Sequence, residues 1–220
     1  MHYDKNDPTT YNNRMGRYKT KTHLKFIQQF APGKGLRILD NGGGNGRLAV
    51  PLADLGYKVT VVDESPVAIE ALSKEQHPGI ECVIGNMEQF EGRVFDLIIA
   101  VDSVKYTHLP LPELFFMFNR LIAPGGLFII MDINTASWRY KLSGILGRYC
   151  HYNIGSADEY RSALDKAGFE TIGMKGFNWM PFTFNSNSPL VGAFAAIEDG
   201  LKLNQWINQS PWLMIAGRKK

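Results

Sequence analysis

A glycine-rich turn constrains this chain more than any other feature. Residues 36–39 are mostly apolar, Asp40 follows them, and four of the five positions in 42–46 are glycine. A helix-like stretch then continues to residue 55. Glycine lets the backbone turn sharply and lets a ligand lie against the main chain, and the first turn of the next helix offers unpaired N–H groups. The pattern is typical of a nucleotide-binding turn, although any strand-to-helix turn of an α/β protein also favours glycine.

Apolar runs and helix-like stretches alternate along the rest of the chain. The runs are bounded by turn residues and indicate buried parallel strands, and the stretches are long enough to cross over between parallel neighbours. We therefore predict an α/β fold: a doubly wound, mostly parallel, seven-stranded Rossmann-like sheet with an antiparallel last strand and helices on both faces. The predicted strands are 36–39, 59–62, 80–84, 95–101, 127–133, 169–174 and 212–217, and the predicted helices are 10–30, 47–55, 66–75, 111–121 and 157–167.

Composition sets limits on the class of protein. A chain of 220 residues with 45% apolar residues predicts one domain with a modest elaboration. The longest uncharged stretch, 177–197, is interrupted by polar residues and prolines, so we expect no membrane span and a soluble, cytoplasmic protein. Cys82 and Cys150 lie far apart without metal-site spacing, so we predict reduced thiols and no metal.

The net charge of +3 is too small to indicate nucleic-acid binding. Basic residues do crowd the first predicted helix, and the simplest interpretation is a solvated helix face. The residues concerned are Arg14, Arg17, Lys19, Lys21 and Lys25.

Two kinds of nucleotide cofactor compete for the glycine turn. The spacing from Gly44 to Ala49 satisfies the G-x-G-x-x-A pattern of nicotinamide-binding proteins, with Asp63 placed to bind ribose hydroxyls. Asp40 favours a different ligand, because a carboxylate beside the turn stabilises cations and disfavours an anionic pyrophosphate. The sign of the ligand charge therefore separates the two interpretations.

With Asp40 included, the turn resembles the first motif of class I S-adenosylmethionine-dependent methyltransferases. The resemblance covers roughly residues 10–135. Residues 59–66 look like the second motif of that family, 84–87 like the third, and 95–103 and 121–129 like the fourth strand and the proline-glycine turn into the fifth. The resemblance implies a cap over 1–31, a cofactor-binding core over 35–135, and a substrate-side elaboration over 136–220.

The resemblance also implies S-adenosylmethionine as cofactor and a set of residues that hold it. Asp63 would bind both ribose hydroxyls, and Asn86 would lie against adenine where most members have Asp; its carbonyl can still accept from the adenine amino group. Arg17 on the first helix would meet the cofactor carboxylate. The full predicted set is Asp40, Gly42, Gly43, Gly44, Gly46, Asp63, Glu64, Asn86, Met87, Val101 and Arg17.

Candidates for contact with the methyl acceptor follow the fourth and fifth strands. By resemblance, Tyr106 and His151 are the predicted catalytic or pocket residues, each with the simpler alternative of a structural or surface role. An aromatic-rich insertion, 176–209, is interpreted either as a lid over a pocket or as a helix packed on the sheet.

We expect a small acceptor with an apolar or aromatic body, methylated on oxygen or nitrogen. A base-flipping motif is absent after Val101, and no strongly basic stripe favours nucleic acid. Two other functions stay open at this point: a catalytically silent cofactor-binding module and a nicotinamide oxidoreductase.

Overall fold

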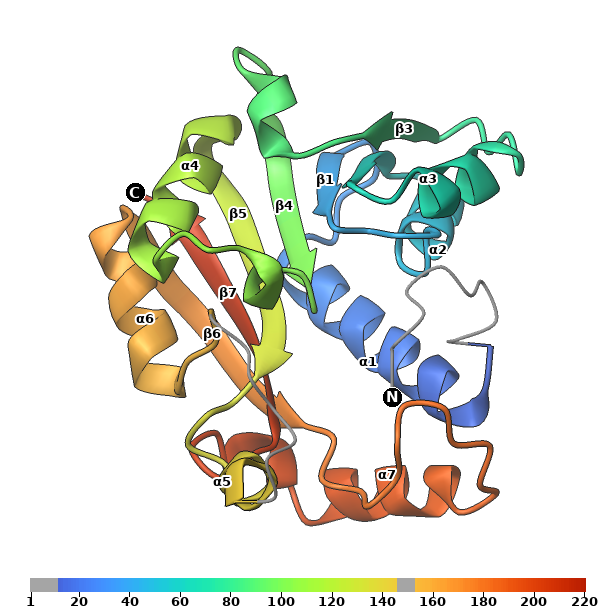
Figure 1. The fold of residues 1–220 in the computed structure, drawn as a ribbon, viewed down its shortest axis with the longest axis vertical. Helices are drawn as coiled ribbons and strands as arrows, with labels where there is room; N and C mark the ends of the chain where they lie inside the picture. Colours follow the sequence, from blue (N-terminus) through green and yellow to red (C-terminus); the bar gives the residue numbers. More distant parts are fainter. Residues whose placement is uncertain (1–11, 146–152) are drawn as a thin grey trace.

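The computed structural model describes residues 12–145 and 153–220. A seven-stranded sheet with the order β3-β2-β1-β4-β5-β7-β6 forms its centre (Figure 1). β1 to β5 pair in parallel, and β7 runs antiparallel to both of its neighbours, β5 and β6. The strands are β1 (Arg37–Asn41), β2 (Lys58–Asp63), β3 (Ile80–Ile84), β4 (Phe95–Val101), β5 (Ile122–Ile133), β6 (Phe169–Phe177) and β7 (Trp212–Lys219). The predicted fold class is confirmed.

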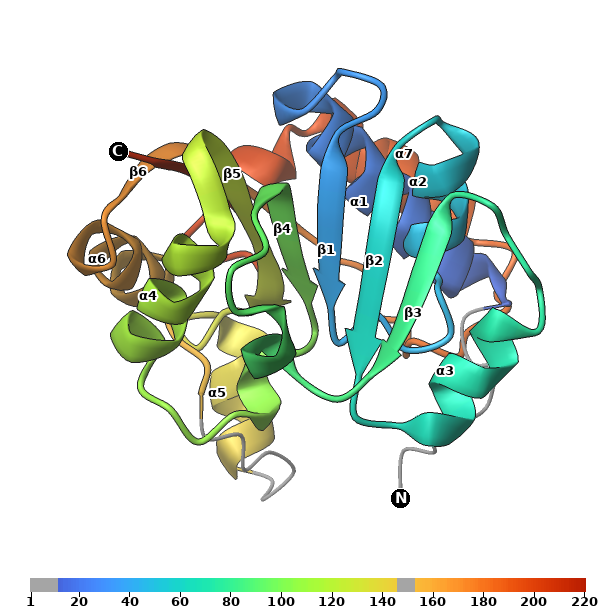
Figure 2. The same cartoon turned by 90° about the horizontal axis from the view of Figure 1, so that it is seen from above.

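Helices cover both faces of the sheet (Figure 2). α1, α2 and α3 contribute buried side chains to one apolar core, and α4 and α6 contribute to another across the sheet. β4 supplies residues to both cores, which explains its nearly continuous apolar sequence. The helices are α1 (Arg14–Phe30), α2 (Ala49–Asp54), α3 (Pro66–Ser73), α4 (Leu111–Leu121), α5 (Trp138–Ile145), α6 (Ala157–Lys166) and α7 (Val191–Gly200), with short turns η1 (Met87–Phe90), η2 (Val104–Tyr106) and η3 (Leu203–Gln205).

Some element boundaries differ from the predicted ones. α1 begins at Arg14 because the side chain of Asn13 caps it, accepting the N–H of Gly16 at 2.8 Å. β5 begins at Ile122, five residues before its predicted start, because Ile122 already pairs with Phe95. β6 continues to Phe177 because its pairing with β7 persists to Trp212.

The carboxyl ends of the parallel strands meet along one edge of the sheet. Asn41 at the end of β1 pairs with Val62 of β2 and with Ala100 of β4. In Figure 2 the arrowheads of β1, β2, β3 and β4 lie along this same lower edge. The loops that follow these strands therefore come together, and in open α/β sheets ligands bind in the crevice at this edge.

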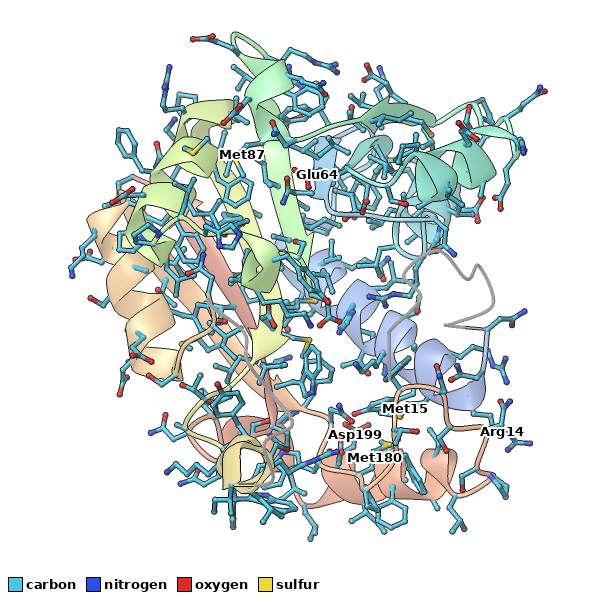
Figure 3. All side chains as sticks on the ribbon, viewed as in Figure 1. Arg14, Met15, Glu64, Met87, Met180 and Asp199 are labelled. Atoms are coloured by element: carbon cyan, nitrogen blue, oxygen red, sulfur yellow. The ribbon has the colours of Figure 1, made fainter. Side chains whose placement is uncertain are left out.

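The aromatic insertion forms α7 and η3. α7 packs against α1 and η3, and η3 lies against β6 at the edge of the sheet, so part of the insertion packs on the sheet. Met15 of α1 and Met180 pack together with Val191 between the two helices, as Figure 3 shows for the two methionines. The side chain of Glu198 completes this contact by accepting the backbone N–H of Met180 at 3.0 Å. The interpretation as a lid stays a prediction.

Within the part of the chain that the structure describes, no helix has the length and apolar character needed to cross a membrane. In the same part, no group of three His, Cys, Asp or Glu side chains is arranged to hold a metal ion.

Candidate functional site

The glycine turn passes directly over buried side chains. A Cβ atom on Gly43 would lie 2.7 Å from Cγ of Asp40 and 2.8 Å from Cγ1 of Val61. Gly42 has φ +74°, and a Cβ there would lie 2.5 Å from Cβ of Ser103. Contacts this short, together with the left-handed backbone at Gly42, require glycine. The turn therefore forms a close backbone cradle at the carboxyl end of β1.

Asp63 ends β2 and fastens the glycine turn to the loop that follows β2. Its Oδ2 accepts the N–H of Gly44 at 3.0 Å, and its Oδ1 accepts the N–H of Ser65 at 2.9 Å. The N–H of Gly46 donates to the carbonyl of Gly43 at 3.0 Å and closes the turn. Each carboxylate oxygen has a second lone pair. Asp63 can therefore hold the turn and still accept two hydroxyl groups from a ligand.

Asp40 lies beneath this turn with only 3% of its surface exposed. Burial raises the pKa of Asp40 to about 7, the nearby Arg47 opposes this rise, and Asp63 adds to it. A cation brought close to Asp40 favours the ionised carboxylate. The electrostatics of the turn thus suit a positively charged ligand and disfavour a pyrophosphate.

Arg47 connects the turn to α1. Its Nη1 donates to Oγ1 of Thr20 at 3.3 Å and lies 3.4 Å from Nδ1 of His23. α1 is therefore held against the turn by polar contacts as well as by apolar packing.

The other predicted cofactor residues lie around the same edge. Asn86 is exposed, and its Oδ1 accepts the N–H of Glu88 at 3.0 Å, so its side chain starts η1. Met87 is buried behind it, and Glu64 is exposed after β2 (Figure 3). Val101 is buried at the end of β4. We call Asp40, residues 42–46, Asp63 and Asn86 the glycine-turn half of the site.

Arg17 lies on the outer face of α1. Its side chain is exposed and lines a groove of about 600 Å³ together with Leu24 of the same helix and with Pro51 and Leu55 of the facing α2 and its end. The arginine that the structure brings to the glycine turn is Arg47. A role for Arg17 at the cofactor stays a prediction.

Of the two predicted catalytic residues, the structure describes only Tyr106. Tyr106 lies in η2 after β4 and is 47% exposed, with its ring centroid 5.4 Å from Nζ of Lys105. His151 lies outside the described residues.

A second group of polar side chains surrounds the ends of β4 and β5. Asp102 follows β4 with φ +60°, and its Oδ1 lies 2.7 Å from Nζ of the buried Lys105. Burial alone would raise the pKa of Asp102, but the ammonium groups of Lys105 and Lys19 lower it. Asp102 therefore carries its charge inside the protein.

Lys19 and Trp212 complete this group. The Lys19 side chain is 3% exposed, and its Nζ lies 3.9 Å from the centroid of the Trp212 ring. Nζ of Lys105 lies 5.5 Å from the same ring. Burial lowers the pKa of Lys19 to about 8. We call Lys19, Asp102, Lys105, Asp132 and Trp212 the lysine half of the site.

Asp132 lies in β5, buried next to Ile133. Its Oδ1 accepts the N–H of Ile133 at 2.7 Å, whereas its Oδ2 is buried without a partner. Burial raises the pKa of Asp132, Lys105 opposes this rise, and Asp102 reinforces it.

Most residues of the lysine half are not indicated by the sequence pattern. The interpretation of the basic residues as a solvated face fits the exposed Arg14, Arg17, Lys21 and Lys25, but it is wrong for Lys19. A signal existed: Lys19 is four residues from both Met15 and His23, which belong to the buried face of α1. Trp212 was assigned only to the last strand.

The sequence of this chain matches one family of known proteins. The model of the methyltransferase domain family matches residues 12–173. A ubiquinone biosynthesis O-methyltransferase from Maricaulis maris is 31% identical over 169 residues, which are 69% of this chain and 66% of that protein. A ubiquinone/menaquinone biosynthesis C-methyltransferase from Rubrivivax gelatinosus is 27% identical over 194 residues, 78% of this chain and 76% of that protein. The chain spans from about half to two thirds of the length of several such relatives.

Solved structures share the fold. The magnesium protoporphyrin IX methyltransferase from Synechocystis, with bound S-adenosylhomocysteine, superposes with a TM-score of 0.65 at 16% identity, covering 94% of this chain and 84% of that one. An N-methyltransferase from Bradyrhizobium japonicum, also with S-adenosylhomocysteine, gives a TM-score of 0.65 at 16% identity, with 94% and 88% covered.

Proposed function

Because the chain belongs to the methyltransferase domain family of class I S-adenosylmethionine-dependent enzymes, we propose that it methylates an oxygen or nitrogen atom of a small acceptor with an apolar or aromatic body. The observation that carries the proposal is the close cradle of Gly43 over the buried Asp40, joined to Asp63 by the N–H of Gly44. The names of the O-methyltransferase relatives favour oxygen over nitrogen.

The residues of the glycine-turn half fit this cofactor by their chemistry. S-adenosylmethionine carries an ammonium and a sulfonium group, and the buried Asp40 would offset the cost of placing these cations in the crevice. Asp63 would accept from the two ribose hydroxyls, and Asn86 with Met87 would lie against the adenine. Glu64 and Val101 complete the proposed contacts, and Arg17 would act on the cofactor carboxylate through solvent.

The cofactor supplies a methyl group already activated by the positive sulfur. The chain therefore needs to orient the acceptor and exclude water, and such positioning lowers a barrier by several kcal/mol, of order 7 or more in favourable cases. The two halves of the site meet at Ser103. This residue directly follows Asp102 in the chain, and its side chain lies against Gly42 of the glycine turn. The proposed acceptor site is the lysine half, and Tyr106 and His151 are the residues proposed to contact the acceptor.

Ligand-dependent thermal unfolding tests the cofactor assignment. S-adenosylhomocysteine at 100 times its dissociation constant should stabilise the wild-type chain by about 2.7 kcal/mol, and NAD should not. Stabilisation by NAD alone would contradict the proposal and restore the oxidoreductase interpretation.

Substitution of Asp63 tests whether the cofactor binds at the glycine turn. Asp63→Ala should weaken S-adenosylhomocysteine binding roughly 100-fold, because it removes acceptors for charge-assisted hydrogen bonds. Glu70→Ala, which changes an exposed acid on the neighbouring α3, is the matched control and should bind like wild type. Equal affinities for Asp63→Ala and wild type would remove Asp63 from the site.

Turnover separates an enzyme from a silent binding module. Incubation with S-adenosylmethionine and phenolic acceptors should release S-adenosylhomocysteine, measured by mass spectrometry together with the methylated product. A chain that binds the cofactor but methylates none of a broad acceptor set would support the silent module instead.

A further inference from the structure

Lys19 is a buried cation on the inner face of α1. Its ammonium lies 3.9 Å from the ring centroid of Trp212, and only 3% of the residue is exposed. Trp212 opens β7 and pairs with Ile133, the last residue of β5. The amine therefore lies over the ends of β5 and β7, inside the lysine half.

The charge of Lys19 is poorly compensated. Among residues 12–145 and 153–220, no carboxylate oxygen lies within 4.0 Å of its Nζ. Asp102 and Asp132 both interact favourably with this charge, but Asp102 is already paired with Lys105 at 2.7 Å, and burial raises the pKa of Asp132. Three further cations, Arg47, Lys105 and Arg139, disfavour that charged form.

A buried ammonium needs a partner. Removing a charge from water is costly unless another charge or several hydrogen bonds compensate it, and contact with an indole ring repays only part of this cost. Three buried polar atoms nearby also lack partners: Nε2 of His23, Oγ of Ser103 and Oδ2 of Asp132. The lysine half is therefore incomplete, and what Lys19 lacks is an anion.

Position along the sheet indicates which ligand carries the anion. β7 is three strands away from β1 in the order β1-β4-β5-β7, which is roughly 14 Å at the usual strand spacing. Trp212 therefore lies beyond β4 and β5 from the strand that carries the glycine turn, whereas the Lys19 amine also interacts electrostatically with Arg47, which directly follows that turn.

Aromatic rings pack beside Trp212. The Phe177 ring centroid lies 6.0 Å from that of Trp212 and 5.1 Å from that of His23, and the His23 and Phe177 rings are nearly perpendicular. Such rings suit an aromatic body.

We propose that Lys19 is a specificity-determining residue that binds a carboxylate on the methyl acceptor, and that the acceptor is therefore an aromatic acid. This inference rests on the proposed methyltransferase function. It deepens that function by naming the class of acceptor.

The test compares acids with neutral analogues. Calorimetry on the chain saturated with S-adenosylhomocysteine should measure the affinity for para-hydroxybenzoate, protocatechuate and caffeate, each beside its neutral amide. Wild type should bind at least one acid roughly tenfold or more tightly than its amide, as expected for a hydrogen bond to a charged group. Lys19→Met should abolish this preference, and the exposed Lys21→Met on the same helix should retain it.

Controls separate recognition from folding. Lys19→Met removes an under-compensated buried charge, so its thermal unfolding midpoint should equal or exceed that of wild type; if it fails to fold, Lys19→Gln provides a second neutral variant. A merely structural Lys19 would leave the preference for the acid unchanged.

The remaining outcomes also decide the matter. No acid preference in wild type, or a preference that survives in Lys19→Met, overturns the proposal. A loss of S-adenosylhomocysteine affinity in Lys19→Met with the acid preference intact assigns Lys19 to the cofactor and overturns it as well. If wild type does not bind S-adenosylhomocysteine, the proposed function itself fails, which is a distinguishable result.

Discussion

The two halves of the site are built in different ways. The glycine-turn half uses backbone N–H groups and short side chains at or just after the ends of β1, β2 and β3, such as Asp63 with Gly44. The lysine half uses long side chains from separate elements: Lys19 from α1, Lys105 from η2 and Trp212 from β7. The first half is fixed by local chain geometry, whereas the second exists only after distant segments pack together.

This difference extends to how well polar groups are satisfied. Both oxygens of Asp63 accept backbone N–H groups. Around the lysine half, by contrast, Oδ2 of Asp132 is buried without a partner. Unsatisfied buried groups are rare in proteins and need an explanation, of which a ligand is one. The comparison indicates a preformed donor site and an acceptor site that is completed on binding.

The largest expected effect breaks the preformed half. Gly43→Ala would place a methyl group 2.7 Å from Cγ of the buried Asp40 and 2.8 Å from Cγ1 of the buried Val61. Neither neighbour has free space, so the turn must shift, and we expect a roughly 100-fold loss of S-adenosylhomocysteine affinity, about 2 to 3 kcal/mol. Isothermal calorimetry measures it.

Gly33→Ala is the matched control for this change. A Cβ at position 33 would make only ordinary contact, 3.7 Å from Leu36, so this variant should bind like wild type. If Gly43→Ala also binds like wild type, the turn is not a rigid cradle and the comparison between the halves fails.

The sequence predicted the glycine-turn half because its chemistry follows strand ends. Once residues 36–39 and 59–62 are recognised as parallel neighbours, Asp40 and Asp63 must lie at one edge of the sheet. The spacing of the glycines then predicts a nucleotide-binding turn beside them. The same logic predicted the sheet and its crossovers. Errors at the start of β5 and the end of β6 arose where pairing across strands extended a segment beyond its apolar core.

The lysine half could not be read in this way. No local sequence pattern predicts that Trp212 lies against α1. That contact depends on how α7 and η3 connect β6 to β7. A lysine within a basic helix is also more often solvated than buried. Only the four-residue spacing from Lys19 to Met15 and to His23 indicates that Lys19 is buried. Helical periodicity predicts which face of a helix is buried, but it does not predict which residues pack against that face.

An intermediate effect concerns Asp40 and pH. Its carboxyl has a pKa of about 7 in the free protein, and an adjacent cation lowers that pKa, so binding a cation releases a proton. The affinity for S-adenosylmethionine should therefore rise roughly tenfold from pH 6 to pH 8. The rise should be smaller for S-adenosylhomocysteine, which lacks the sulfonium charge, and Asp40→Asn should remove it.

Stability should show the opposite dependence. Because burial raises the pKa of Asp40 above its ordinary value of 3.8, the native state binds the proton more tightly than the unfolded chain, and this contribution to stability is lost as pH rises from about 4 to about 7. Asp40→Asn should consequently raise the thermal midpoint at pH 8 but not at pH 4. A midpoint that falls at pH 8 would show that the ionised carboxylate stabilises the free turn, contrary to its burial.

The smallest expected effect concerns the outer face of α1. If α1 contributes to the site through its inner face, then Arg17, which is exposed in the groove beside Pro51 and Leu55, interacts with a cofactor carboxylate only through solvent. Arg17→Ala should weaken S-adenosylhomocysteine binding roughly threefold, the usual size of an exposed charge interaction. Lys25→Ala in the same groove is the control and should have no effect. A loss of tenfold or more for Arg17→Ala would mean that α1 turns this face toward the cofactor when it binds. Lys19 would then leave the ring of Trp212, and the division of α1 into a recognising inner face and a solvated outer face would no longer hold.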